Sequence, residues 1–154
     1  MTRAVSVAVA AGLAFAPACG STPAPAAPAS GTTSPASKAP KAPQKIVQLN
    51  DPGAPVDVAA ALPAGYVTVV DFWGVACEAC VTFGRMLETG VAGEPRVVIR
   101  KIDVGDGDTP VAEAYKIAVL PHFFIYDKQK RLRYDLVGPD CKDATKFALE
   151  LAAE

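Results

Sequence analysis

Two cysteines three positions apart, Cys77 and Cys80, are the residues of this chain best suited to chemistry. They follow an apolar run, residues 66–73, that contains a single acid, Asp71. Two thiols at this spacing can close a small disulfide ring at the beginning of a helix, where unpaired backbone N–H groups and the positive end of the helix dipole favour a thiolate. Because the thiolate is the attacking species in thiol–disulfide exchange, the pattern predicts redox chemistry with Cys77 as the nucleophile.

A Cys-x-x-Cys pair is also found as a structural disulfide or as half of a structural zinc site, which needs four ligands. The spare candidate ligands here are His122 and Cys141, and they do not form a second close pair. We therefore favour redox chemistry over zinc, and we expect no metal and no cofactor besides the redox-active pair.

His122 and Cys141 each allow two readings. For His122 we favour a strand histidine that faces a helix over a contact with the cysteine pair. For Cys141, near the start of the last helix, we favour a small structural residue over a third redox partner.

The first 18 residues have the pattern of a secretory signal peptide. Arg3 precedes an apolar run, residues 4–16, and the small residues Ala16-Pro17-Ala18 follow. The run would rise only about 20 Å as a helix, short of the roughly 30 Å hydrocarbon core of a bilayer. We expect an exported protein, located in the periplasm or at the cell surface.

Cys19 comes directly after this segment, a position that resembles the acylated first residue of a bacterial lipoprotein, although Ala16 stands where that family prefers Leu. We predict lipidation of Cys19; the alternative is cleavage before an unmodified cysteine. Residues 19–44 are rich in Pro, Ala and Ser, so we expect an extended tether without a core. Membrane attachment would then be through the lipid anchor alone.

Residues 45–154 are long enough for one domain with a single core. They contain all 16 acids of the chain and 12 of its 15 Lys and Arg residues. This balance leaves no basic stripe, so nucleic acid is not an expected partner. We expect a monomer.

The hydrophobic pattern of this domain alternates between strands and helices. Strands are expected at residues 45–50, 66–73, 96–104, 122–127 and 132–137, and helices at 56–62, 78–89, 109–115 and 142–152. In the helix 78–89, we expect Val81, Met86 and Leu87 to face the core. The βαβ portions require parallel strands and the final hairpin adds antiparallel ones, which predicts an α/β fold with a central mixed β-sheet flanked by helices on both faces.

Three local signatures in this order resemble the thioredoxin family. They are Val70-Asp71-Phe72-Trp73 before the Cys-x-x-Cys pair, Ile102-Asp103-Val104 at the end of the next strand, and Tyr115-Lys116-Ile117 followed by Val119-Leu120-Pro121. The 41 positions from Cys80 to Pro121 suit a minimal thioredoxin, without the insertion of the cytochrome-c-maturation branch. The resemblance covers essentially all of 45–154 and implies a thioredoxin fold.

The activity that this resemblance implies is that of a thiol–disulfide oxidoreductase acting on protein disulfides or dithiols. The export signal adds a membrane electron donor or acceptor as an expected partner, because cytosolic reductases cannot reach an exported protein. The alternative from another class is a non-catalytic thioredoxin-fold module that binds a protein partner or a metal ion. The direction of the reaction, reduction or oxidation of the client, is left open by the sequence.

The resemblance also implies roles for single residues. Asp71 would be the buried acid that relays a proton to and from Cys80. Pro121 would be cis and lie against the cysteine pair, and the backbone of Leu120 would pair with the substrate strand. Trp73 would pack beneath the active-site loop, with a simple core tryptophan as the alternative.

The residues around the cysteines depart from the usual family pattern. Ala76 replaces the Trp before the first cysteine, Glu78-Ala79 replaces Gly-Pro between the two, and Val81 stands where a Lys is common. We expect these positions, with Ala76 as part of the substrate-binding surface, to affect redox potential and partner choice more than the fold.

Overall fold

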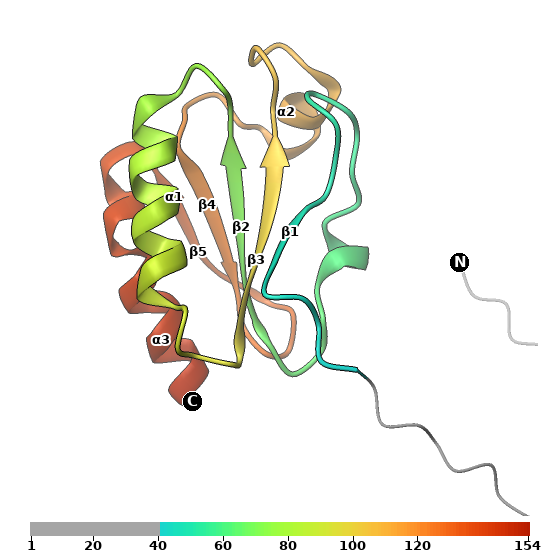
Figure 1. Cartoon of the computed structure of the whole chain (residues 1–154). Coiled ribbons are helices and arrows are strands. Elements are labelled where there is room, and N and C mark those ends of the chain that lie inside the picture. The colour runs from blue at the N-terminus through green and yellow to red at the C-terminus, as the bar shows by residue number, and fades with distance from the viewer. Residues whose placement is uncertain (1–40) are drawn as a thin grey trace, which may run out of the picture. The chain divides into compact units, whose positions relative to one another are not determined.

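The computed structural model describes residues 41–154. The predicted signal peptide (1–18), the predicted lipid on Cys19 and nearly all of the predicted tether (19–44) lie outside the described residues. At the centre of the described part, five strands form one mixed β-sheet (Figure 1). Its spatial order is β1 (Ile46–Gln48), β3 (Val97–Asp103), β2 (Val67–Trp73), β4 (His122–Tyr126) and β5 (Leu132–Val137).

Strands β1, β3 and β2 are parallel, whereas β4 is antiparallel to β2 and β5 is antiparallel to β4. Helices α1 (Glu78–Gly90) and α3 (Ala144–Ala153) lie together on one side of the sheet. The short helix α2 (Pro110–Tyr115) and the 3₁₀ helix η1 (Ala59–Ala61) lie on the other side (Figure 1). The predicted α/β fold, a mixed sheet flanked by helices on both faces, is confirmed.

The central strand β2 is buried on both faces because its side chains are almost all apolar. Val67 and Val69 belong to the core beneath α1 and α3, whereas Val70 and Phe72 belong to the core beneath α2 and η1. Since side chains alternate along a strand, Asp71 shares the face of Val67 and Val69 and lies beneath α1. The strand thus carries one acid into an apolar core, directly before the loop that leads to the cysteine pair.

Helix α1 buries a different stripe from the one expected. Leu87 is 1% exposed, as predicted, but Val81 and Met86 are 45% and 49% exposed, so the prediction for these two was wrong. The buried positions are Cys80, Gly84 and Leu87, which are spaced by four and three residues and therefore share one face of the helix. Val81 and Met86 lie outside this stripe and are therefore exposed.

Two further elements differ from the expectation. The helix predicted at 56–62 is a single 3₁₀ turn, Ala59–Ala61, and it ends at Leu62, whose backbone is extended because the residue before a proline disfavours helical geometry. The last helix begins at Ala144 rather than at Lys142, after a 3₁₀ segment η2 (Gly138–Asp143). Helix α2 has Thr109 as its N-cap and Pro110 as its first residue, as predicted.

Candidate active site

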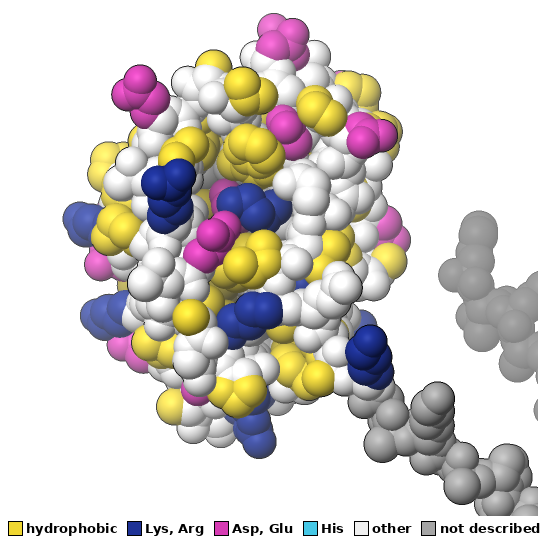
Figure 2. Space-filling view, in the orientation of Figure 1, with side chains coloured by type: hydrophobic (Ala, Val, Ile, Leu, Met, Phe, Trp, Pro, Cys, Tyr) yellow, Lys and Arg dark blue, Asp and Glu magenta, His cyan; other side chains and the backbone are white. Residues whose placement is uncertain are grey.

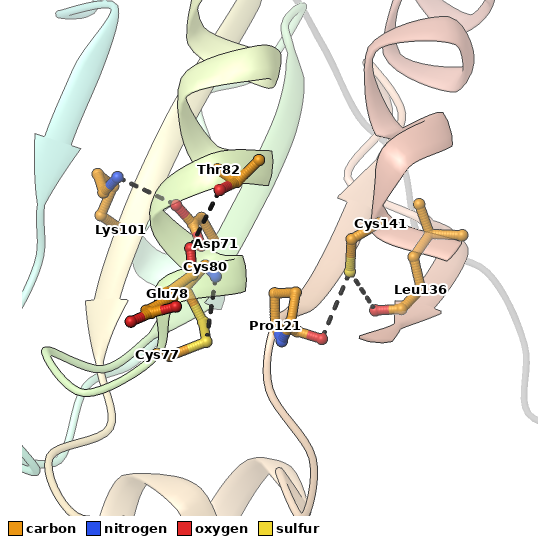
Figure 3. Close-up of a disulfide and its surroundings, with 9 residues drawn as sticks. All are labelled: Asp71, Cys77, Glu78, Cys80, Thr82, Lys101, Pro121, Leu136 and Cys141. Atoms are coloured by element: carbon orange, nitrogen blue, oxygen red, sulfur yellow. Dashed lines mark hydrogen bonds and ion pairs between the residues drawn. A yellow bond between two sulfur atoms is a disulfide. The ribbon is translucent and has the colours of Figure 1, made fainter. Parts of the chain in front are cut away.

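Cys77 and Cys80 form a disulfide at the N-terminus of α1 (Figure 3), with their Cα atoms 5.2 Å apart. Cys77 is the N-cap of the helix, and its Sγ accepts a hydrogen bond of 3.1 Å from the backbone N–H of Cys80. Cys77 is half-buried, while Cys80 is 2% exposed. The helix terminus therefore stabilises negative charge on the Cys77 sulfur, and that sulfur is the one that another molecule can reach.

Asp71 is a buried carboxylate beneath the first turns of α1. It is 1% exposed, and a Cβ added at Gly84, one turn after Cys80, would lie 3.4 Å from its Oδ2. Burial disfavours the charged form and raises the pKa of Asp71 from 3.8 to about 6, although the nearby Lys101 ammonium opposes the increase. At neutral pH this acid is therefore close to the point where it takes up or releases a proton.

Lys101 is the partner of Asp71 that reasoning from the sequence missed. The parallel register of β2 and β3 places the two residues opposite each other, and the Lys101 Nζ lies 3.1 Å from the Asp71 Oδ2 (Figure 3). The same Nζ lies 2.9 Å from Oε1 of Glu88 on α1. Lys101 lies within the predicted strand 96–104, but its partner depends on the strand register, which the sequence does not specify.

Trp73 forms one wall of a cavity beside the inner cysteine. Its side chain is half-buried, its indole N–H donates a 3.2 Å hydrogen bond to Oε1 of Gln48, and the Lys101 ammonium lies 5.6 Å from its ring centroid. The cavity has a volume of about 170 Å³ and is lined by Trp73, Cys80, Val81, Arg85, Glu88 and Lys101. Trp73 is thus neither fully buried nor remote from the cysteines.

A second cavity, of about 240 Å³, lies on the outer side of the cysteine pair. Its lining brings together three of the predicted site residues, Ala76, Cys77 and Leu120. The peptide bond between Leu120 and Pro121 is cis, as the resemblance implied. The carbonyl oxygen of Pro121 accepts hydrogen bonds from the N–H of Gly138 at 2.8 Å and from the thiol of Cys141 at 3.4 Å, so this loop is held from the side of η2.

Cys141 is enclosed within the core. It is 2% exposed, and its thiol donates to the carbonyl oxygens of Pro121 and of Leu136, the latter at 3.3 Å. Burial raises the pKa of Cys141 to about 12, so it is a thiol at neutral pH. A buried, protonated sulfur is a poor nucleophile, which favours the structural reading of this residue.

His122 lies on the face of the sheet opposite to Asp71. It is 6% exposed, its Nε2 is 2.6 Å from Oδ1 of Asp135, and its ring packs edge-on against Phe124 with centroids 5.0 Å apart. The structure therefore separates it from the cysteine pair. Among residues 41–154, no group of three or more His, Cys, Asp and Glu side chains is arranged to hold a metal ion.

Exposed apolar side chains accompany the site. Val75 in the loop before Cys77 is 76% exposed, and Val119 before the cis peptide bond is 53% exposed. Figure 2 shows hydrophobic and acidic side chains gathered at the top of the view, the end of the molecule where β2 ends and α1 begins. Such side chains beside a reactive cysteine suit contact with another polypeptide.

No protein-family model matches the sequence, and no curated protein sequence matches it either. Among solved structures, a reduced thioredoxin pre-protein from Schistosoma mansoni matches with a TM-score of 0.55 and 20% identity, over 70% of this chain and 99% of that chain. A thioredoxin mutant from Halobacterium salinarum matches with a TM-score of 0.57 and 18% identity, over 73% of this chain and 96% of that chain. A thioredoxin from Malassezia sympodialis matches with a TM-score of 0.52 and 21% identity, over 71% and 94%.

At these identities the matches establish the fold, and the chemistry of the site has to be argued from its own residues. The described residues combine that fold with a disulfide-forming pair at a helix N-terminus, a buried acid and a cis proline loop. The chain is therefore a protein of thioredoxin fold whose Cys-x-x-Cys pair forms a disulfide, and this combination supports a thiol–disulfide oxidoreductase.

Proposed function

We propose that this protein is an extracytoplasmic thiol–disulfide oxidoreductase that cycles Cys77 and Cys80 between dithiol and disulfide in exchange with protein substrates. The observation that carries the proposal is the unequal exposure of a bonded pair: the sulfur at the helix N-cap is reachable, and its partner is 2% exposed. A structural disulfide needs no such asymmetry, whereas a two-step exchange needs one sulfur to attack and one to resolve.

In the reductive direction, the Cys77 thiolate attacks one sulfur of a substrate disulfide. A mixed disulfide forms, and the first substrate sulfur leaves as a thiolate. Cys80 then loses its proton and attacks the Cys77 sulfur, which releases the second substrate sulfur and closes the Cys77–Cys80 disulfide. The substrate gains two electrons and the dithiol loses two; the released thiolates take up protons. The oxidative direction is the reverse.

Asp71 is proposed to accept the proton of Cys80 during the second step. Cys80 is enclosed by protein, so its thiol needs a base nearby once the mixed disulfide covers the outer sulfur. Asp71 lies beneath the same helix, one turn beyond Cys80, and its pKa of about 6 lets it hold the proton and release it near neutral pH.

The substrate would bind over the outer cavity. The side chains of Ala76 and Leu120 line it beside Cys77, and the exposed Val75 and Val119 extend the apolar surface. By resemblance, the backbone of Leu120 pairs with the substrate strand and Pro121 holds that segment next to the sulfurs. Trp73 would support the active-site loop from the inner side.

An export signal in residues 1–18 and a lipid on Cys19 belong to this proposal. Both rest on the sequence pattern, because these residues lie outside the described part of the chain. No helix in the described part of the chain has the length and the apolar character needed to span a bilayer. Because cytosolic reductases do not reach an exported protein, a membrane protein would supply or remove its electrons. No resident cofactor is proposed besides the cysteine pair.

The reduction of insulin by the full chain tests this proposal. The Cys77→Ser variant should lose the activity, whereas Glu150→Gln, which changes an exposed residue on α3, should retain it. Retention of activity in Cys77→Ser would overturn the proposal. A non-catalytic module would instead be inactive as wild type, and a metal-binding one would copurify with about one equivalent of metal under reducing conditions.

The direction of the reaction is set by the reduction potential. Equilibration of the full chain with a series of glutathione redox buffers, with Cys77 and Cys80 followed by thiol trapping, measures this potential. A value near the roughly −270 mV of thioredoxin indicates a reductant, and one near the roughly −120 mV of a strong periplasmic oxidant indicates an oxidant.

A further inference from the structure

The ammonium group of Lys101 lies between two carboxylates that come from different elements. Its Nζ is 3.1 Å from Oδ2 of Asp71 on β2 and 2.9 Å from Oε1 of Glu88 on α1. The exposed fractions of the side chains rise from 1% for Asp71 to 23% for Lys101 and 33% for Glu88. The three charges thus form a short chain from the buried acid to the surface.

The small cavity beside Cys80 gives this chain of charges its position in the site. Glu88 and Lys101 line the same cavity as Cys80, so water that enters it meets the inner cysteine and the ion pair together. Gly84 of α1 lies directly over the ion pair, since a Cβ there would be in ordinary contact with both groups, 3.4 Å from the Asp71 carboxylate and 3.6 Å from the Lys101 Nζ.

One ammonium shared by two carboxylates cannot neutralise both. The attraction to Asp71 and Glu88 outweighs the effect of burial on Lys101 and holds the pKa of its ammonium above the ordinary value, so Lys101 stays charged. Neither oxygen of the Asp71 carboxylate accepts a hydrogen bond from the described residues, so the ion pair with Lys101 is the contact that stabilises its charge. The stability of the Asp71 carboxylate therefore depends on how strongly Lys101 interacts with it while Lys101 also interacts with Glu88.

We propose that Glu88 is a positioning residue of the redox centre: it divides the Lys101 ammonium between two carboxylates and so keeps Asp71 able to take up and release a proton. The functional meaning of this role rests on the thiol–disulfide exchange proposed above. The role itself is a property of the three side chains and exists in the disulfide form as well.

The other ionisable groups on the elements that pack against Asp71 do not replace Glu88. Helix α1 also contributes Cys80, which is bonded in the disulfide form, and Arg85, which lines the cavity. The segment η2 contributes Cys141, whose thiol is protonated. On β4, the residue opposite Asp71 is Phe123, which carries no charge.

Replacement of Glu88 by Gln separates the charge of this residue from its geometry. The amide oxygen of Gln still accepts a hydrogen bond from Lys101, so the ammonium keeps its place. The competing negative charge is lost, and the full attraction of Lys101 then acts on Asp71. The loss of the negative charge at position 88 and the stronger attraction of Lys101 to Asp71 both favour the carboxylate form of Asp71, so its pKa should fall.

The test is a carbon-13 NMR titration of the Asp71 carboxyl carbon in the full chain with the disulfide intact, with Asp71→Asn to assign the signal. Glu88→Gln should lower the midpoint by about half a pH unit or more, about a threefold change in the proton dissociation constant. Glu150→Gln is the matched control, because it removes the same charge from an exposed position near the end of α3, and it should leave the midpoint in place.

An Asp71 midpoint in Glu88→Gln that stays at the wild-type value, or that moves upward, would overturn the proposal. The midpoint is measured in the oxidised protein and needs no substrate, so it decides the role of Glu88 even if the insulin assay fails. If the wild type is active, the acidic limb of its pH profile should move in the same direction in Glu88→Gln and not in Glu150→Gln.

Discussion

Asp71 and Lys101 face each other across two parallel strands, and the carboxylate that is 1% exposed lies 3.1 Å from an ammonium that is 23% exposed. This pair keeps an ionisable acid beside the apolar core beneath α1 and α3. Attraction to Lys101 reduces the effect of burial but does not cancel it, which leaves the pKa of Asp71 at about 6. The proton of this residue therefore links the stability of the fold to pH.

The first prediction concerns Asp71→Asn and pH. The pKa of Asp71 is raised in the folded protein, so its contribution to stability is fully present below about 3.8 and is lost as the pH rises through about 6. Asparagine has no such loss. Relative to wild type, the free energy of unfolding of the variant should therefore increase by on the order of 2–3 kcal/mol between pH 4 and pH 8.

Urea unfolding at pH 4, 6 and 8, with the disulfide intact, measures this difference. The control is Asp106→Asn, which removes an exposed acid, and its curve should run parallel to that of the wild type. A constant difference between Asp71→Asn and wild type over this pH range would contradict the raised pKa.

The second prediction concerns Cys80→Ser. The exposed Cys77 can still attack a substrate disulfide, but the sulfur that resolves the mixed disulfide is gone. Turnover should fall by more than about 100-fold while a covalent adduct accumulates on Cys77. Non-reducing gels and peptide mapping detect the adduct. Cys77→Ser is the control and should form no adduct. An adduct of equal yield in Cys77→Ser would show that Cys77 is not the attacking sulfur.

The third prediction concerns the relative reactivity of Cys77 and Cys141. Cys141 is 2% exposed and burial raises its pKa to about 12, so it should resist iodoacetamide at pH 8 in the folded, reduced protein. Cys77 should react within minutes under the same conditions. Mass spectrometry of the digested protein, before and after unfolding in urea, locates the labels. Labelling of Cys141 at a rate similar to that of Cys77 would show that its enclosure in the core is wrong.

The fourth prediction compares two glycines of α1. A Cβ at Gly84 meets Asp71 and Lys101 at ordinary contact distances, and Ala is better than Gly in a helix by about 1 kcal/mol, so Gly84→Ala should retain or slightly increase the stability. A Cβ at Gly90 would overlap the side chain of Thr145 on α3, so Gly90→Ala should cost about 1–3 kcal/mol.

Urea unfolding compares both variants with Gly93→Ala, where an added Cβ meets nothing within 4 Å. The order of stability, with Gly84→Ala above Gly90→Ala, is the outcome that matters. The reverse order would mean that α1 and α3 do not pack as described.

Reasoning from the sequence succeeded where neighbours along the chain decide the structure. The apolar run that ends at Trp73 predicted a strand buried on both faces, and Thr109-Pro110 predicted the start of α2. It failed for Val81 and Met86, which are exposed although they are apolar. The face that a helix buries depends on how the helix sits on the sheet, and hydrophobicity alone does not specify this orientation.

By itself, the sequence determined the Cys-x-x-Cys pair at a helix start, the acid inside an apolar strand and the alternation of strands and helices, because these depend on residue type and short-range spacing. Only the tertiary structure decided that Lys101 pairs with Asp71 and that Glu88 shares this ammonium. Those contacts join β2, β3 and α1, and they require both the parallel strand register and the position of the helix above it. The proton affinity of the buried acid depends on these long-range contacts.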